Sequence, residues 1–239
     1  METTLNDFLG GKIRLLQYKN GYRITSDTVL LAAAVQAKKN ETVLDVGTGT
    51  GGVLFCLHAR IPELNSTGIE IQTDLYQLAL KNQEINQYKI HFINEDIFSE
   101  KSTLHGIQFH HVVTNPPFYT EDLIRNHPQT ATAYHQTFDL SRWLRFCLKH
   151  LRAKGSFTLI HRTEALPEIL AILNKTALGG IEVIPIQPKE NAASKRVIVR
   201  GIMGSKKPFV LRAPLIMHTE TNERTELAEK IMREGYPIE

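Results

Sequence analysis

Runs of β-branched and other apolar residues alternate along the chain with segments whose apolar residues recur at helical spacing. The runs that predict strands cover residues 42–47, 67–72, 90–98, 109–118 and 155–162. The segments that predict helices cover residues 25–37, 52–60, 73–87, 139–155 and 163–176. Strands that alternate with helices pair in parallel, because each connection must cross a face of the sheet. We therefore predict an α/β fold with a doubly wound, mostly parallel sheet.

Both ends of the chain depart from this alternation. Residues 181–188 and 196–203 are strand-like with no helix between them, which predicts an antiparallel pair at one edge and seven strands in all. Asn20-Gly21 is typical of tight turns and predicts a short hairpin over 12–24. A last helix is expected over 223–235. We see no linker and predict a single domain, 1–239, made of a hairpin and helix (1–40), a core (41–205) and a tail with a helix (206–239).

Composition narrows the class of protein. The net charge is only +3, but seven basic residues and one acid, Glu190, lie between Lys189 and Arg212, which favours an anionic partner. The two cysteines lie far apart, so neither a disulfide framework nor a zinc site is indicated, and no metal is expected. The longest apolar run, VLLAAAV, is too short to span a bilayer, and no secretory signal opens the chain. These features predict a cytoplasmic protein.

A glycine-rich loop follows the first strand of the alternating part. In VLDVGTGTGG, Gly47, Gly49 and Gly52 form a GxGxxG pattern between a strand and a helix, a context that suits a nucleotide-containing ligand. Asp45 stands two residues before the pattern, where a carboxylate would repel a pyrophosphate and attract a cation. S-adenosylmethionine carries ammonium and sulfonium groups and no phosphate. Asp45 therefore favours this methyl donor over a nicotinamide dinucleotide.

Two further acids close the next strands. Glu70 is placed to accept hydrogen bonds from ribose hydroxyls, and Asp96 to accept one from an adenine amine, with Ile97 and Phe98 against the ring. Asp27 and Thr28, at the start of the alanine-rich helix, are expected to close over the methionine end. The predicted cofactor-binding residues are Asp27, Thr28, Asp45, Gly47, Gly49, Gly51, Glu70, Ile71, Asp96 and Ile97.

The strand 109–118 ends at two consecutive prolines in VVTNPPF. Each proline fixes its own φ and lacks an N–H, so the chain leaves the sheet at a stiff corner. Together, DVGTGTG, GIE, NEDIF and TNPPF resemble the amino-methylating branch of the class I S-adenosylmethionine-dependent methyltransferases, which have a Rossmann-like fold. The resemblance implies that Asn115 and the carbonyl of Pro116 accept the two protons of a planar amine. It also implies that Pro117 stiffens the corner and that Phe118 stacks on the substrate ring.

Segments outside these motifs narrow the resemblance. GYRITSDTVLLAAAV, WLRFCLKHL, GSFTLIHR, SKRVIVRG and APLIMH are similar to bacterial tRNA adenine-N6 methyltransferases, from about residue 8 to residue 236. Those enzymes modify the adenosine beside the anticodon of a valine tRNA. For this chain the resemblance implies one methyltransferase domain with a catalytic core at 41–205 and a tRNA partner. Phosphates would then contact Lys195, Arg196 and Arg200, and Tyr119 would line the base pocket.

Other functions stay open at this point. The same chemistry could act on the N2 amine of a ribosomal guanine or on a protein glutamine. The GxGxxG pattern could serve a nicotinamide-dependent oxidoreductase, although Asp45 and the NPPF corner disfavour it. A non-catalytic RNA-binding module could keep the fold, although the acids at three strand ends argue against that. Trp143, at helical spacing with Phe146, is interpreted as a core residue.

Overall fold

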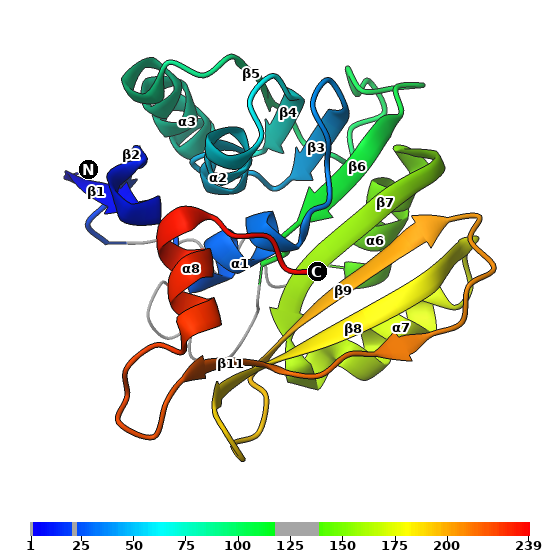
Figure 1. Cartoon of the computed structure of the whole chain (residues 1–239). Coiled ribbons are helices and arrows are strands. Elements are labelled where there is room, and N and C mark those ends of the chain that lie inside the picture. The colour runs from blue at the N-terminus through cyan, green and yellow to red at the C-terminus, as the bar shows by residue number, and fades with distance from the viewer. Residues whose placement is uncertain (1, 21–22, 118–138) are drawn as a thin grey trace.

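The computed structural model describes residues 2–20, 23–117 and 139–239 (Figure 1). Its first element is a hairpin in which β1 (Thr3–Phe8) pairs antiparallel with β2 (Ile13–Tyr18) around a short turn, Leu9–Gly11. The predicted hairpin over 12–24 is therefore wrong, because the partner of β2 precedes it in the sequence.

Two asparagines of α3 (Thr73–Asn86) explain why β2 makes no second strand pairing at its other edge. The Asn82 side chain accepts a hydrogen bond from the Leu16 N–H (2.6 Å) and donates to the Leu16 carbonyl (3.1 Å). Asn86 bonds the N–H and carbonyl of Arg14 in the same way. These amides satisfy backbone groups that a further strand would otherwise satisfy.

The large sheet contains nine strands among the described residues, rather than the seven predicted. Their order is β10-β8-β9-β7-β6-β3-β4-β5, and β11 also pairs with β8. The strands are β3 (Thr42–Val46), β4 (Asn65–Glu70), β5 (Ile90–Asn94), β6 (Phe109–Thr114), β7 (Leu151–Arg162), β8 (Leu178–Lys189), β9 (Arg196–Met203), β10 (Val210–Leu211) and β11 (Leu215–His218). Only β9 runs against its neighbours. The predicted mostly parallel α/β fold is confirmed.

The two additional strands lie beyond the antiparallel pair β8–β9, so that pair is confirmed but is not the outermost. β10 and β11 pair in parallel with successive stretches of the 12-residue β8. Strands of two and four residues are too short to produce a readable alternation in the sequence.

Helices cover both faces of this sheet (Figure 1). The helices α1 (Ser26–Ala34), α2 (Gly52–Arg60), α3 and α8 (Glu226–Glu234) lie on one side, and α6 (Leu140–Lys149) and α7 (Leu166–Leu173) lie on the other. Helix α6 is shorter than the predicted 139–155. It begins at the Asp139 cap and ends at Lys149, because Leu151 already pairs with Phe109 in the sheet.

Alternate residues of the central strands enter two separate cores. Val43, Val113 and Ile160 pack with α1 and α2, whereas Leu44 and Val112 pack with α6. This alternation follows from the period of two along a strand whose two faces are both covered. The first core also holds Ile231 of α8, so residues from the last part of the chain pack with α1. Among the described residues, no helix is long and apolar enough to cross a membrane.

Candidate active site

The parallel strands bring the predicted cofactor and catalytic residues to one edge of the sheet. Val46 lies beside Ile69 on one side and beside Thr114 on the other. The segments that follow β3, β4 and β6 therefore start at the same level. They lie at the edge of the sheet toward which the strand arrows of β3, β6 and β7 point in Figure 1. Ligands of open α/β sheets bind at this edge.

Asp45 is buried beneath the glycine loop. The residue is 1% exposed, and its Oδ2 accepts a hydrogen bond from the Thr48 hydroxyl (2.7 Å). Burial raises the pKa of Asp45 to about 7; the Thr48 hydrogen bond opposes this rise, and the nearby negative charge of Glu70 adds to it. A cation beside Asp45 would lower its pKa and restore the ionised carboxylate. A cationic ligand is also what the position of Asp45 in the sequence predicts.

Glu70 holds the glycine loop against the end of β4. Its Oε2 accepts from the Gly49 N–H (2.9 Å) and its Oε1 from the Gln72 N–H (2.9 Å). Burial raises the pKa of Glu70 above its ordinary value, and these backbone donors oppose that shift. Each carboxylate oxygen can accept more than one hydrogen bond, so both can still receive ribose hydroxyls.

The conformation and packing of the loop favour glycine, most clearly at Gly47 and Gly51. Gly47 has φ of 73°, and a Cβ there would lie 3.0 Å from the ring of Trp143. Gly51 has φ of 86°, and a Cβ there would lie 2.7 Å from the ring of Phe55. These φ values are ones that only glycine adopts without strain. Gly52 opens α2 and packs against the methyl group of Thr28, which is buried.

Asn115 follows β6 directly and carries a buried side-chain oxygen. Its Oδ1 atom is fully buried and has no hydrogen-bond partner among the residues that the structure describes. Pro116 is buried and Pro117 is exposed. A buried acceptor without a donor destabilises a protein by about 1–3 kcal/mol. This oxygen is therefore suited to an external N–H group. The predicted roles of Phe118 and Tyr119 lie outside the described residues.

Trp143 is a site residue that the sequence analysis missed. Its indole Nε1 donates to the Thr114 hydroxyl (2.9 Å), and that hydroxyl donates to the Val46 carbonyl (2.8 Å). The same ring lies against Gly47. Trp143 thus supports both the residue before Asn115 and the start of the glycine loop. The N–H of an indole in the interior usually donates to an acceptor. The helical spacing of Trp143 does not show that this acceptor is Thr114.

We expect Trp143→Phe to lower kcat several-fold and the free energy of unfolding by about 1 kcal/mol, because the ring remains while one hydrogen bond is lost. Thr114→Val should have a similar effect. In a double-mutant cycle, the two changes should be non-additive in kcat by at least ~0.5 kcal/mol of activation free energy. Additive effects would mean that the contact does not position the corner.

The remaining cofactor residues lie at the ends of β4 and β5. Asp96 is exposed, and its Oδ1 accepts from the Phe98 N–H (2.9 Å). Ile97 is buried, whereas Ile71 is 44% exposed. The exposed Asp96 and Ile71 leave surface available to a ligand, and their predicted contacts with adenosine stay predictions.

The structure pairs two residues that the sequence analysis assigned to different ligands. Arg196 Nε lies 2.8 Å from Asp27 Oδ2, and the Asp27 side chain is only 11% exposed. Thr25 is the N-cap of α1, and its side chain accepts from the Asp27 N–H. The ion pair gives both Asp27 and Arg196 a structural partner, and their contacts with ligands stay predictions.

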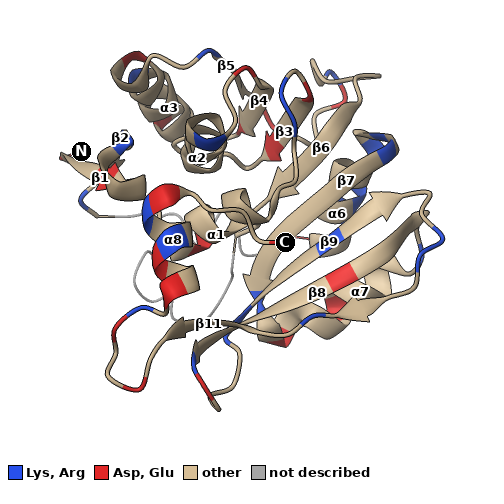
Figure 2. Ribbon diagram, in the orientation of Figure 1, with Lys and Arg blue, Asp and Glu red and all other residues tan. Residues whose placement is uncertain are grey.

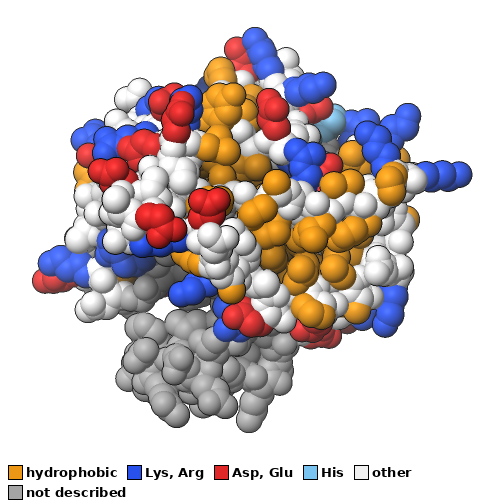
Figure 3. Space-filling view, turned by 60° about the horizontal axis from the view of Figure 1, so that its bottom comes forward, with side chains coloured by type: hydrophobic (Ala, Val, Ile, Leu, Met, Phe, Trp, Pro, Cys, Tyr) orange, Lys and Arg blue, Asp and Glu red, His pale blue; other side chains and the backbone are white. Residues whose placement is uncertain are grey.

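The other predicted phosphate-binding residues differ in exposure. Lys195 is exposed, but Arg200 is 12% exposed, pairs with Glu182 (2.7 Å) and donates to the Ile238 carbonyl. In the view of Figure 3, charges of both signs surround an area of hydrophobic side chains, and this view shows no broad basic face. The basic residues that lie close together in the sequence therefore differ in how accessible their charges are to a phosphate.

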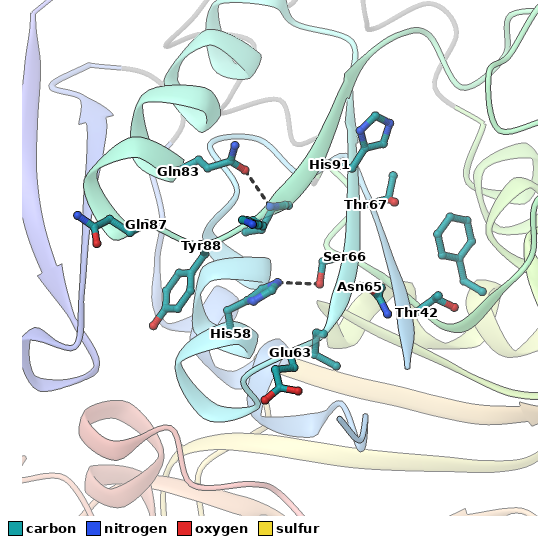
Figure 4. A pocket seen from close by; sticks show the side chains of 14 residues that line it. Thr42, His58, Glu63, Asn65, Ser66, Thr67, Gln83, Gln87, Tyr88 and His91 are labelled. Carbon is teal, nitrogen blue, oxygen red and sulfur yellow. Dashed lines mark hydrogen bonds between the residues drawn. The ribbon is translucent and has the colours of Figure 1, made fainter. Parts of the chain in front are cut away.

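A cavity of about 780 Å³ lies at the opposite edge of the sheet, by the amino ends of β4 and β5 (Figure 4). His58 points into it and lies 3.0 Å from the Ser66 hydroxyl, and Gln83 accepts from the Ile90 N–H. Burial lowers the pKa of His58 to about 4, so this histidine is neutral near pH 7. None of the predicted catalytic or cofactor-binding residues lines this cavity.

Comparisons with known proteins identify the family of this chain. Residues 20–175 match the family model described as "Methyltransferase small domain". The tRNA1(Val) (adenine(37)-N6)-methyltransferase of Glaesserella parasuis is 26% identical over 74% of this chain and 75% of its own length. The enzyme of that name from Actinobacillus succinogenes is 24% identical over 97% of both chains.

Solved structures show the same fold. A predicted O-methyltransferase from Agrobacterium tumefaciens superposes with a TM-score of 0.72, at 24% identity over 89% of this chain and 98% of its own. A SAM-dependent O-methyltransferase from Thermotoga maritima gives a TM-score of 0.55, at 15% identity over 79% and 69% of the two chains. The sheet order, the glycine loop and the family match lead to one conclusion: the chain belongs to the methyltransferase small domain family and has the fold of the class I S-adenosylmethionine-dependent methyltransferases.

Proposed function

We propose that this protein transfers a methyl group from S-adenosylmethionine to the exocyclic N6 amine of an adenine beside the anticodon of a tRNA. The observation that carries the proposal is the buried Asn115 oxygen, which has no donor among the described residues. An amine N–H group is a suitable partner for it. The names of the relatives, tRNA1(Val) (adenine(37)-N6)-methyltransferase, support the choice of adenine and of tRNA. With tRNA as the substrate, the protein would act in the cytoplasm.

The residues around the glycine loop fit S-adenosylmethionine, which supplies an electrophilic methyl group on a cationic sulfur when bound. The buried carboxylate of Asp45 favours the cationic groups of that molecule, because a positive charge offsets the cost of ionising it. Glu70, with lone pairs left on both oxygens, would accept the ribose hydroxyls. Asp96, Ile97 and Ile71 would contact the adenine, and the loop from Gly47 to Gly51 would approach the ligand with its backbone.

The NPPF corner would act on the amine of the substrate. The lone pair of an aromatic amine is delocalised into its ring, which makes the nitrogen a poor nucleophile. Asn115 Oδ1 and the Pro116 carbonyl, by accepting its two N–H groups, would favour a tetrahedral nitrogen and the positive charge that develops on it. The two prolines would hold these acceptors in place, and Phe118 and Tyr119 would stack on the base.

The test is to incubate the protein with labelled S-adenosylmethionine and, separately, with total tRNA, ribosomal RNA or protein from a strain that lacks it. We expect label in tRNA, recovered as N6-methyladenosine and identified by mass. Label in guanine-N2 of ribosomal RNA or in glutamine would replace the proposed acceptor, and no label in any fraction would contradict methyl transfer to these acceptors.

A further inference from the structure

Two arginines face each other across the sheet where β7 ends and β9 begins. Arg162 and Arg196 are directly opposite residues of this antiparallel pair, so their side chains leave the same face of the sheet. Figure 2 shows basic segments side by side at this point. Like charges placed directly opposite each other destabilise a sheet. The register of the sheet thus brings two cationic side chains together at one point.

The same sheet contains a contrasting arginine four residues away. Arg200, on the same strand and face as Arg196, lies opposite Glu182 of β8 and pairs with it at 2.7 Å. Arg196 lies opposite Arg162 on one side and Ile186 on the other. Its carboxylate partner, Asp27, comes from α1 instead. The sheet thus provides a cross-strand acid for Arg200, but places a second cation beside Arg196.

The pair stands next to the catalytic corner. Thr114, the last residue of β6, lies beside Leu159 of β7, and β7 continues for three more residues to Arg162. Three residues of strand extend for about 10 Å. The backbone at Arg162 and Arg196 therefore lies beyond the level of Thr114, on the side of the ligand-binding edge.

Nearby groups add to the positive character of this place. Lys195 is exposed and adjacent to Arg196, so three cationic residues lie close together at the ends of β7 and β9. The adjacent His161 is affected by these charges. Burial is the main cause that lowers its pKa to about 4; a backbone hydrogen bond with Arg162 opposes this shift, and the charges of Arg162 and Arg196 add to it.

We propose that Arg162 and Arg196 together bind a backbone phosphate of the RNA substrate, next to the nucleotide whose base enters the NPPF corner. Guanidinium groups match the geometry of phosphate oxygens, and contacts of this kind position a nucleic acid without reading its sequence. The inference rests on the proposed function, because it takes RNA as the substrate. Arg162 would be a substrate-binding residue that the sequence analysis did not identify.

The variant that tests this is Arg162→Gln, with Arg152→Gln as a matched control. Arg152 lies on the same strand at the opposite edge of the sheet, where it contacts His110. For Arg162→Gln we expect the KM for tRNA to rise about 10-fold and the slope of log affinity against log salt concentration to fall by about 0.7–0.9. The affinity for S-adenosylmethionine should not change, and Arg152→Gln should behave like the unmodified protein. Arg162→Lys should recover part of the tRNA affinity.

Two results would overturn the inference. One is an unchanged salt slope and KM for a folded Arg162→Gln protein, with folding checked by circular dichroism. The other is weaker binding of S-adenosylmethionine with unchanged RNA binding, which would assign the pair to the methionine carboxylate. Failure of the proposed function is read separately, from methylation of tRNA by the unmodified protein. Even if tRNA is not methylated, the salt slopes of RNA binding for the two proteins still support or contradict the phosphate contact.

Discussion

Replacing Asn115 with alanine is expected to lower kcat by at least 10²–10³, in the range seen when one preorganised hydrogen-bonding group is removed from a reacting centre. The affinity for S-adenosylmethionine should persist, since Asn115 is proposed to contact only the methyl acceptor. Single-turnover methylation of tRNA and calorimetric titration with S-adenosylmethionine would measure the two effects separately.

Asn65→Ala is the matched control for this experiment. Asn65 opens β4 at the opposite edge of the sheet and donates to the Asn40 carbonyl from an exposed position. Its removal should leave kcat unchanged. If Asn115→Ala methylates tRNA at the normal rate, the catalytic assignment of the NPPF corner is wrong.

Replacing Asp45 with asparagine is expected to weaken S-adenosylmethionine binding about 10- to 100-fold above pH 7, because a charged hydrogen bond or contact is lost. The exposed Asp74, replaced in the same way, serves as the control. Titration with S-adenosylhomocysteine locates the effect: a smaller loss for this uncharged-sulfur analogue would place Asp45 near the sulfonium. Equal affinity of Asp45→Asn and the unmodified protein for S-adenosylmethionine would remove the role.

The raised pKa of Asp45 gives this variant a second signature. In the free protein the Asp45 carboxyl has a pKa of about 7, well above the ordinary aspartate value of 3.8, so it binds a proton over a pH range in which the unfolded chain does not. Its contribution to stability is therefore full below pH 3.8 and is lost as the pH rises through 7. S-adenosylmethionine should favour the ionised form, so affinity should rise with pH through 7 in the unmodified protein and stay flat in Asp45→Asn.

The sequence was sufficient to predict the central strands of the sheet and the edge at which the candidate site residues meet, because these depend on local pattern. Most residues of β3 and β6, and most of those in the second halves of β4 and β7, are buried, as expected for strands covered on both faces. Asp45 and Glu70 were identifiable because each stands at a strand end, and parallel strands bring such ends together.

Contacts between distant parts of the chain were not predictable in this way. One edge of β2 pairs with β1, and the backbone groups of its other edge bond Asn82 and Asn86, more than 60 positions away in the sequence. The pairing of Asp27 with Arg196 joins residues 169 positions apart. Each of these residues is also compatible with an exposed or ligand-binding position, so only the folded geometry distinguishes the alternatives.

The buried oxygen of Asn115 also bears on how this protein would respond to engineering. It has no donor among the described residues, so a smaller apolar side chain at position 115 is expected to raise the free energy of unfolding. Screens that select for heat resistance alone would tend to discard the residue that we propose to be catalytic. Thermostable variants should therefore be selected with methyl transfer as a second criterion.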